Sequence, residues 1–343
     1  TPRYHPPNPT HPPRECTTNA ERERAMETAG ASFSTGHADM IHDCQLDYYG
    51  KLLATCSSDR YIKIFEVNDG APPTHVADIA GHDGPVFEVS WAHPKFGKVL
   101  ASCSYDRSVI IWKEDGAGTW TKVHVSKLHD LSVNSISWAP YEYGLMLAAA
   151  SSDGHVSIIA HNESRGWTEQ KFEAHNIGVN AVSWGPAVAP ASLVNSSMPV
   201  GAPLKCFVTG GSDKLVKVWT FSETDDTWTA ETLAGHGDWV RDVAWAPNIG
   251  LPSNTIASCC QDGRVIIWSK SDKSSAWAKQ ELHSFGGPVW RLSWSVTGNI
   301  LAVCSGDNKV SMWKEGLDDK WSCISTLAQG EGVTAPVDPS AST

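Results

Sequence analysis

The sequence has 343 residues and a formal net charge of −11, from 38 acidic and 27 basic side chains. Nucleic-acid-binding surfaces carry a basic stripe, so this charge predicts no direct nucleic-acid binding. No apolar stretch is as long as a membrane span and the N-terminus has no signal-peptide core, so neither a membrane-spanning nor a secreted protein is predicted.

Three segments of the chain lack the pattern of folded structure. Residues 1–35 contain Pro, His, Arg and Glu but almost no large apolar side chains, which predicts a disordered N-terminal extension. The tail at residues 329–343 is rich in Pro, Ser and Thr, and we expect it to be disordered as well. A Pro-, Ala- and Ser-containing stretch at residues 185–205 indicates a surface-loop insertion. Residues 36–328 are predicted to form one domain.

Two spacings recur six times between residues 36 and 328. An Asp is followed six residues later by an aromatic or aliphatic residue, and upstream a second pair, such as His82 and Trp91, is separated by nine residues. Because two independent spacings agree six times, the domain is one repeated unit. The six Asp pairs are Asp59/Phe65, Asp106/Trp112, Asp153/Ile159, Asp213/Trp219, Asp262/Trp268 and Asp307/Trp313.

The second unit illustrates the strands expected in each repeat. Residues 86–91, 99–103 and 108–112 are β-rich runs separated by turn residues, and a fourth run follows Trp120. Four strands per unit, with Gly-His at the start and an Asp turn before Trp, resemble the WD repeat of β-propellers. The resemblance implies an all-β, six-bladed propeller with four antiparallel strands per blade.

The repeated polar residues are expected to form hydrogen-bonded networks. A buried carboxylate needs partners, which a His ring, a hydroxyl four residues before the Asp and an indole N–H can supply. Units three and six have Ala149 and Val303 in place of that hydroxyl, so we expect apolar packing there. The complete sets are His82/Ser102/Asp106/Trp112, His175/Thr209/Asp213/Trp219 and His236/Ser258/Asp262/Trp268.

A hydrolase is an alternative interpretation, because Ser, His and Asp form catalytic triads on unrelated folds. The set recurs at three matching positions, however, whereas a catalytic site needs one exposed nucleophile. No zinc-ligand spacing is present, and four of the nine cysteines stand three residues before the repeat Asp, as core residues would. We therefore predict no enzymatic activity, no metal and no cofactor, and a reduced cytoplasmic or nuclear setting.

The two ends of the repeat array predict a seam. The first unit begins with an inner strand at residues 40–46, the last ends with an outer strand at 321–327, and nothing β-rich precedes His37. No clasp strand is therefore available, and we expect blades one and six to close the ring only by packing face to face. Such a seam, including Ile41 and Trp321, is a candidate acceptor for a β-element from a partner chain.

The mouth of the central channel is the alternative binding site. One position, four residues before the last residue of each inner strand, carries different side chains in different units. The residue just before that position is aliphatic in all six units. Trp and Arg dominate interface hot spots, so Trp239, Arg241, Trp290 and Arg291 are the candidates for peptide binding. The variable positions are His42, Phe87, Asn134, Asn180, Arg241 and Trp290.

Longer stretches of the sequence resemble one family of WD-repeat proteins. The segments Ile41-His42-Asp43, Leu53-Ala54-Thr55-Cys56 and Asp238-Trp239-Val240-Arg241-Asp242 look like the propeller shared by the COPII outer coat and the Y-shaped scaffold of the nuclear pore. The resemblance implies an open propeller that completes itself with a blade donated by a large coat subunit or a scaffold nucleoporin. Ile41, His42 and Asp43 are then candidate partner contacts.

The same resemblance implies where such a scaffold would act. It implies the cytoplasmic face of ER-derived vesicles, with membrane association through the coat, and the nuclear envelope at the pore. It also implies a nutrient-sensing complex that regulates TOR, and no homo-oligomer. A paralogous open propeller that occurs only in the nuclear pore is the alternative identity.

Overall fold

The computed structural model describes residues 33–68, 71–116, 118–187, 204–248, 253–271, 276–316 and 320–328. The predictions for residues 1–32, for the tail at 329–343 and for most of the insertion at 185–205 concern residues outside these ranges. No helix among the described residues is long and apolar enough to cross a membrane.

The described chain forms six four-stranded antiparallel sheets, each built from consecutive strands, which we number as blades 1 to 6. Blade 1 contains β1 (Ile41–Leu46), β2 (Leu52–Ser57), β3 (Tyr61–Glu66) and β4 (Thr74–Ala80), and blade 2 contains β5 (Val86–Trp91), β6 (Val99–Ser104), β7 (Val109–Glu114) and β8 (Trp120–Ser126). Blade 3 contains β9 (Val133–Trp138), β10 (Leu145–Ser151), β11 (His155–Asn162) and β12 (Gly166–Glu173), and blade 4 contains β13 (Val179–Trp184), β14 (Cys206–Gly211), β15 (Leu215–Ser222) and β16 (Thr227–Ala234). Blade 5 contains β17 (Val240–Trp245), β18 (Asn254–Cys260), β19 (Arg264–Lys270) and β20 (Ala278–Ser284), and blade 6 contains β21 (Val289–Trp294), β22 (Ile300–Ser305), β23 (Lys309–Glu315) and β24 (Trp321–Ala328).

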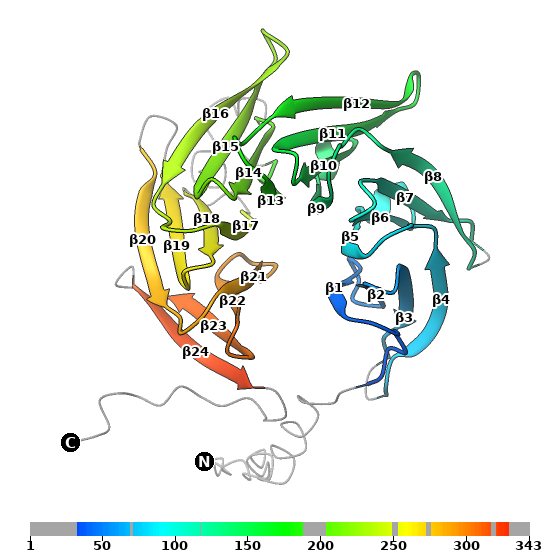
Figure 1. The fold of residues 1–343 in the computed structure, drawn as a ribbon, viewed down its shortest axis with the longest axis horizontal. Helices are drawn as coiled ribbons and strands as arrows, with labels where there is room; N and C mark the ends of the chain where they lie inside the picture. The colour runs from blue at the N-terminus through cyan, green and yellow to red at the C-terminus, as the bar shows by residue number, and fades with distance from the viewer. Residues whose placement is uncertain are drawn as a thin grey trace, which may run out of the picture.

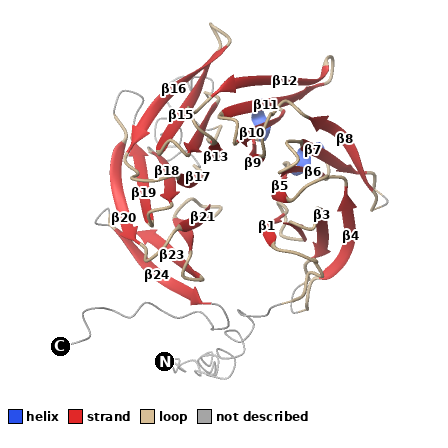
Figure 2. Ribbon diagram, viewed as in Figure 1, coloured by secondary structure: helices blue, strands red, loops and turns tan. Residues whose placement is uncertain are grey.

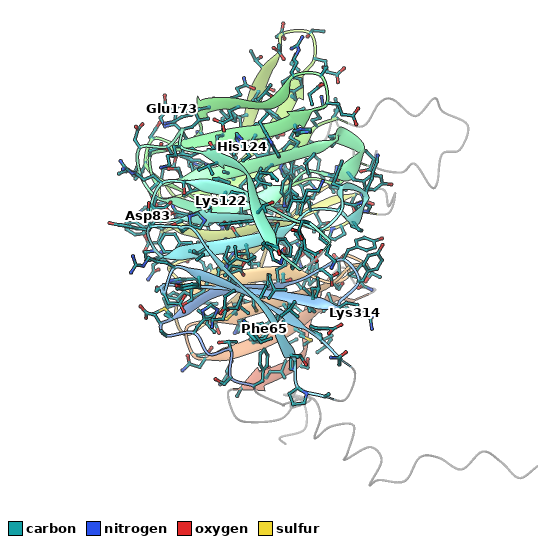
Figure 3. The ribbon with its side chains drawn as sticks, turned by 90° about the vertical axis from the view of Figure 1, so that its right-hand side faces the viewer. Phe65, Asp83, Lys122, His124, Glu173 and Lys314 are labelled. Carbon is teal, nitrogen blue, oxygen red and sulfur yellow. The ribbon has the colours of Figure 1, made fainter. Side chains whose placement is uncertain are left out.

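The blades stand around a central channel, with the first strand of each innermost and the fourth outermost (Figure 1). The remaining described structure is loops and two short 3₁₀ turns, Pro94–Phe96 and Tyr141–Tyr143 (Figure 2). Outer strands face solvent: Lys122 and His124 on β8 and Glu173 on β12 lie on the outer surface (Figure 3). The predicted fold class, an all-β propeller of six four-stranded blades, is confirmed.

The Asp turns place the third strand of every blade. Each repeat Asp accepts a hydrogen bond from the backbone N–H two residues later, as Asp106 Oδ1 does from Ser108 at 2.9 Å. The residue between them adopts a left-handed conformation, with φ of 71° at Arg107 and 82° at Gly263. Asp supports such tight turns because its side chain replaces a missing backbone acceptor. The turn therefore fixes the register of the second and third strands.

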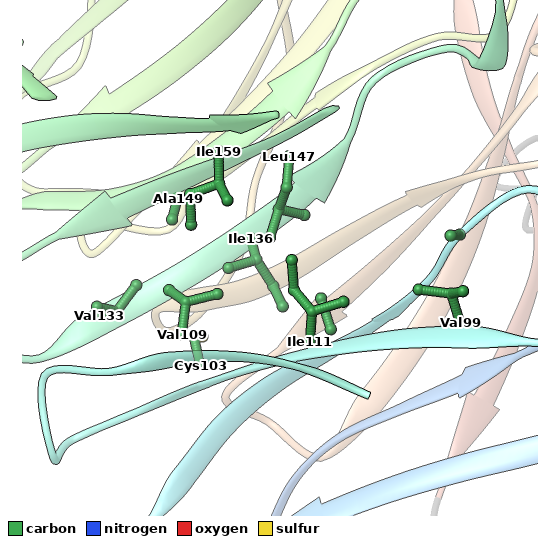
Figure 4. Close-up of a cluster of buried hydrophobic side chains, with 11 residues drawn as sticks. Val99, Cys103, Val109, Ile111, Val133, Ile136, Leu147, Ala149 and Ile159 are labelled. Carbon is green, nitrogen blue, oxygen red and sulfur yellow. The ribbon is translucent and has the colours of Figure 1, made fainter. Parts of the chain in front are cut away.

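Neighbouring blades pack through apolar faces. Between blades 2 and 3, Cys103 and Ile111 of blade 2 meet Ile136, Leu147 and Ile159 of blade 3, and nearly all of these side chains are inaccessible to solvent (Figure 4). Because a central blade is covered on both faces, its middle strand is continuously buried, as in β6. Equivalent cores join blades 1 and 2, 3 and 4, 4 and 5, and 5 and 6.

The ring is open between blades 6 and 1. Inner strands touch in sequence from β1 to β21, whereas among the described residues β21 has no comparable packing against β1 and no apolar core joins their sheets (Figure 1). The expectation that blades 1 and 6 pack face to face is therefore wrong. No described strand from either end of the chain enters the sheet at the other end.

Candidate functional site: the open seam

The seam face of blade 6 has the composition of a blade-to-blade core but no covering blade. In blade 2 the face toward the next blade consists of Ala101, Cys103, Val109 and Ile111, all at most 1% exposed. The register of the strands assigns the same positions in blade 6 to four residues that are only partly buried: Ala302, Cys304, Val310 and Met312. Because uncovered apolar surface is often a binding surface, this face is a candidate interaction site.

The facing wall in blade 1 is exposed in the same way. The first residue of each inner strand is a fully buried Val in blades 2 to 6, whereas Ile41 in blade 1 is 42% exposed. Cys44 is exposed as well, although its counterpart Val89 is inaccessible. Both exposures have one cause, because no described blade packs against this face of blade 1. The outer part of this wall is covered by Phe33, whose ring lies 5.4 Å from that of Phe65.

Acidic and hydroxyl side chains link the inner strands at the rim of the channel. Glu88 Oε2 accepts the backbone N–H of Ile136 in the next blade at 2.7 Å, and Asp242 Oδ2 accepts that of Leu292 at 2.8 Å. Asp43 does the same toward Val89 at 3.2 Å. With Ser135 Oγ, which accepts the N–H of Val182, and Ser183 Oγ, which accepts that of Trp245, such bonds span every junction from blade 1 to blade 6 and link all six inner strands.

Arg291 of blade 6 reaches the far end of the ring. Its Nη1 lies 2.8 Å from Oε1 of Glu88 in blade 2, and its Nη2 lies 3.6 Å from Oδ1 of Asp43 in blade 1. Burial raises the pKa of Asp43 to about 6, although Arg291 opposes the shift, and burial raises the pKa of Asp242 to about 7. Glu88 holds the pKa of Arg291 well above its ordinary value, so the guanidinium stays charged.

Asp242→Asn is expected to gain stability relative to wild type as the pH rises from 5 to 8.5, although its single side-chain oxygen cannot keep the hydrogen bonds from both Val243 and Leu292. The pKa of Asp242 is raised in the folded state, so its unfavourable contribution is complete above about pH 7 and absent below the unfolded pKa of about 3.9. The pKa difference of about three units, at about 1.36 kcal/mol each, sets an upper limit of about 4 kcal/mol. Urea unfolding of the variant and the wild type at both pH values measures the difference between their free energies of unfolding. The same difference at pH 5 and pH 8.5 would contradict the raised pKa of Asp242.

The mouth of the channel is a cavity of about 440 Å³ lined by all six variable positions. Inner-strand registers shift at these positions, as between Val240 and Asp242, and the resulting bulge turns the intervening side chain toward the channel. Arg241 lies between Trp239 and Trp290, with its guanidinium carbon 5.4 and 5.0 Å from their rings, and its Nε donates to Gln261 at 2.7 Å. Both indoles are 46% exposed.

In blades 2 and 4 all four side chains of the predicted polar network are connected by hydrogen bonds. In blade 2, Nδ1 of His82 lies 2.9 Å from Oδ2 of Asp106 and its Nε2 lies 2.7 Å from Oγ of Ser102, which also accepts the Trp112 indole N–H at 2.8 Å. The pKa of Asp106 is lowered because hydrogen bonds from His82 and Ser108 outweigh its burial. In blade 4 the corresponding side chains make the same contacts: His175, Thr209, Asp213 and Trp219.

Blade 5 departs from this arrangement. Ser258 still bonds His236 and Trp268, but Asp262 turns to the Arg264 guanidinium, whose Nε lies 3.0 Å from it. Nδ1 of His236 is then buried without a partner, and burial lowers the pKa of His236 to about 4. The expected Asp–His bond is therefore wrong here, because Arg264 competes for the carboxylate. Cys260 also lies close enough to share a metal ion with His236 and Asp262, but a cation would have to displace Arg264.

In blades 3 and 6 a serine on the third strand supplies the hydroxyl that the second strand lacks. Ala149 pairs with Ser157, whose Oγ lies 2.9 Å from Nε2 of His129. Val303 pairs with Ser311, whose Oγ accepts the Trp313 indole N–H at 2.8 Å. Apolar packing alone was expected in these blades, and that expectation is wrong. Cross-strand partners share a face, so either strand can present the hydroxyl.

The candidate partner-binding residues separate into three places. Ile41 lies on the seam wall, and Asp43 lies at the rim, where it pairs with Arg291. Arg291 also lines the channel mouth, as do three others, with Trp239 beside them: His42, Arg241 and Trp290. Trp321 is not at the seam, because its ring lies 5.7 Å from that of Trp294 and packs on the core between blades 5 and 6. Both indoles belong to the face toward blade 5.

Sequence reasoning missed the blade 6 wall formed by Ala302, Cys304, Val310 and Met312. The signal was present in the repeat: Ala and Cys recur at alternate positions of the middle strand in blades 1, 2, 5 and 6. Alignment of the units would have assigned these residues to the face toward the next blade, and no described sheet covers that face of blade 6.

Comparisons with known proteins agree with this architecture. The WD domain, G-beta repeat, matches residues 30–66, 73–113, 229–269 and 279–314. The chain is 60% identical to the human protein SEC13 homolog over 88% of this chain and 95% of that protein, and 50% identical to protein transport protein sec13 of Emericella nidulans over 89% and 100%. It is 56% identical to the SEC13 homolog of Dictyostelium discoideum over 87% and 98%. The chain therefore belongs to the SEC13 family of WD-repeat proteins.

Proposed function

We propose that the chain is a non-enzymatic scaffold whose open seam receives a β-blade donated by a large partner subunit. One observation carries the proposal: the two walls of the seam retain the residues of a blade-to-blade core, yet no described blade covers them. A seventh sheet placed there would bury Ile41 on one side and Met312 on the other. The interface would be apolar and permanent.

We propose three settings: a vesicle coat, the nuclear pore and a signalling complex. The first is the COPII outer coat, in transport from the ER to the Golgi, with a large coat subunit as donor; relatives named protein transport protein support it. The second is the outer ring of the nuclear pore, with a scaffold nucleoporin as donor, and the third is a TOR-regulating nutrient-sensing complex. The chain would lie in the cytoplasm at vesicle membranes, bound through the coat, and at the nuclear envelope.

Blade donation would act mechanically. A partner segment held as the seventh sheet of a propeller loses the freedom of a linker, since its strands pack against two neighbouring blades. The partner would therefore become rigid where it enters the propeller. A membrane-bending cage requires such rigid joints, and no bond-making chemistry is needed. Ser102 and His82 are buried and hydrogen-bonded to each other, in keeping with a structural role.

A second candidate function is peptide binding at the channel mouth. The arrangement of Arg241 between two half-exposed indoles favours it, because aromatic and arginine side chains dominate interface hot spots. This site and the seam are built from different side chains. Variants can therefore separate the two functions.

Size-exclusion chromatography with a blade-containing fragment of a large COPII coat subunit tests the proposed function. We expect a one-to-one complex with wild type and with the channel variant Arg241→Ala/Trp290→Ala. We expect no complex with Met312→Asp, whereas Val296→Asp, which changes a side chain that is 91% exposed, leaves binding intact. Loss of the complex in the channel variant alone would assign binding to the mouth and overturn the seam proposal.

A further inference from the structure

Arg291 occupies a position that accepts a hydrogen bond in other blades. The third residue of the inner strand accepts a backbone N–H of the following blade in blades 1, 2, 3 and 5, through Asp43, Glu88, Ser135 and Asp242. Blade 4 has Ala181 there and is linked to blade 5 by Asn180, which donates to the Val240 carbonyl at 2.7 Å. Blade 6 is the last described blade, so an acceptor at Arg291 would have no following N–H to receive.

The Arg291 side chain extends instead to the opposite end of the array. Its two terminal nitrogens face Glu88 of blade 2 at 2.8 Å and Asp43 of blade 1 at 3.6 Å. Both carboxylates also hold the next blade by their second oxygen, so the contact ties Arg291 to the backbone of blades 2 and 3. A charge-assisted, two-point contact fixes geometry better than a single point charge would.

Removing the guanidinium would leave like charges at the rim. Asp43, Glu88 and Asp242 all act electrostatically on Arg291, and Glu88 acts on both aspartates in the direction that disfavours their ionisation. Without the cation these carboxylates would repel one another across the two ends of the array. Arg291 thus attracts the carboxylates of blades 1 and 2 from across the opening, while the outer strands of blades 6 and 1 stand apart (Figure 1).

We propose that Arg291 fastens the inner rim of the open ring and thereby sets the width of the seam before any partner binds. The inner ends of blades 6 and 1 are then held at one distance, and their separation increases toward the outer strands. One consequence rests on the proposed function: a wider or more variable seam would receive a donated blade less tightly. The fastening itself is a property of the isolated chain, and it is tested without a partner.

Pulsed electron-spin distance measurements on the isolated chain test the fastening. Spin labels are placed through non-canonical amino acids at the exposed positions of Glu66 on β3 and Lys314 on β23, so the native cysteines remain. Arg291→Met removes the charge at similar length. We expect a longer and broader distance distribution than in wild type. The control is Arg264→Met, which breaks an ion pair inside blade 5, and we expect it to leave the distribution unchanged.

A second measurement keeps the proposal testable if Arg291→Met does not fold. Arg291 is 38% exposed, so salt should screen its contacts. In wild type we expect the distribution to broaden as ionic strength rises to about 1 M, where the Debye length is about 3 Å. A folded Arg291→Met with the wild-type distribution, or a wild-type distribution independent of salt when the variant does not fold, would overturn the proposal. Neither result depends on whether the seam takes a donated blade.

Discussion

Ile41→Asp is expected to weaken binding of a donated blade by at least about 100-fold while leaving the isolated chain folded. The side chain is 42% exposed in the open ring, so a carboxylate there stays hydrated and costs the free protein little. In the proposed complex the same carboxylate would be buried in an apolar interface without a partner. That cost exceeds about 3 kcal/mol, which corresponds to about two orders of magnitude in Kd.

The matched control for this substitution is Val76→Asp. Val76 is also aliphatic and 47% exposed, but it lies on the outer strand β4 rather than on the seam wall. Titration calorimetry with the coat-subunit fragment and thermal melting of each free variant give the two quantities needed. Equal affinities of the two variants would show that the wall of blade 1 is not part of the binding surface.

Ser102→Ala is expected to destabilise the protein by about 2–6 kcal/mol. The Ser102 hydroxyl is inaccessible and bonds both His82 and the Trp112 indole, so its removal leaves two buried polar groups unpaired at about 1–3 kcal/mol each. Blades 3 and 6 suggest a rescue, because they carry the hydroxyl on the cross-strand partner. In blade 2 that partner is Ile110.

A double-mutant cycle tests this interchange. Ile110→Ser alone should cost about 2–4 kcal/mol, since a buried apolar side chain is lost. The double variant Ser102→Ala/Ile110→Ser should cost about 1–3 kcal/mol less than the sum of the two, because the hydroxyl at position 110 can bond the same His and Trp. Chemical denaturation of the four proteins provides the free energies. If the two changes in free energy of unfolding simply add, a hydroxyl at position 110 does not replace the one lost from Ser102.

The sequence predicted those features that depend on spacing along one strand or turn. The Asp-to-Trp interval fixed six units because it spans one tight turn and one strand, and both have rigid geometry. The order of strands within each blade followed from short connections between antiparallel neighbours. The six variable positions at the channel mouth were identified for the same reason, since the interval to the inner-strand Trp is constant.

Features that depend on contacts between strands were predicted less well. Ser157 and Ser311 replace a hydroxyl across the sheet, and a pattern along one strand contains no information about its partner's register. Arg264 takes the Asp262 carboxylate from His236, a competition between side chains of similar reach. Trp321 was assigned to the wrong face: it pairs with Glu315, two residues after Trp313, so both indoles share the face toward blade 5, as Trp167 shares its face in blade 3.

Hydrogen exchange with and without the coat-subunit fragment tests most directly whether the seam is the binding site. Strands β1 and β23 lie at the open ends of the array and have fewer apolar contacts than their counterparts, so their amides should exchange faster in the free chain. The account predicts that binding slows exchange in β1, β22 and β23 and leaves β17 at the channel mouth unchanged. Slower exchange confined to β17 and the start of β21, with β1 and β23 unaffected, would contradict it.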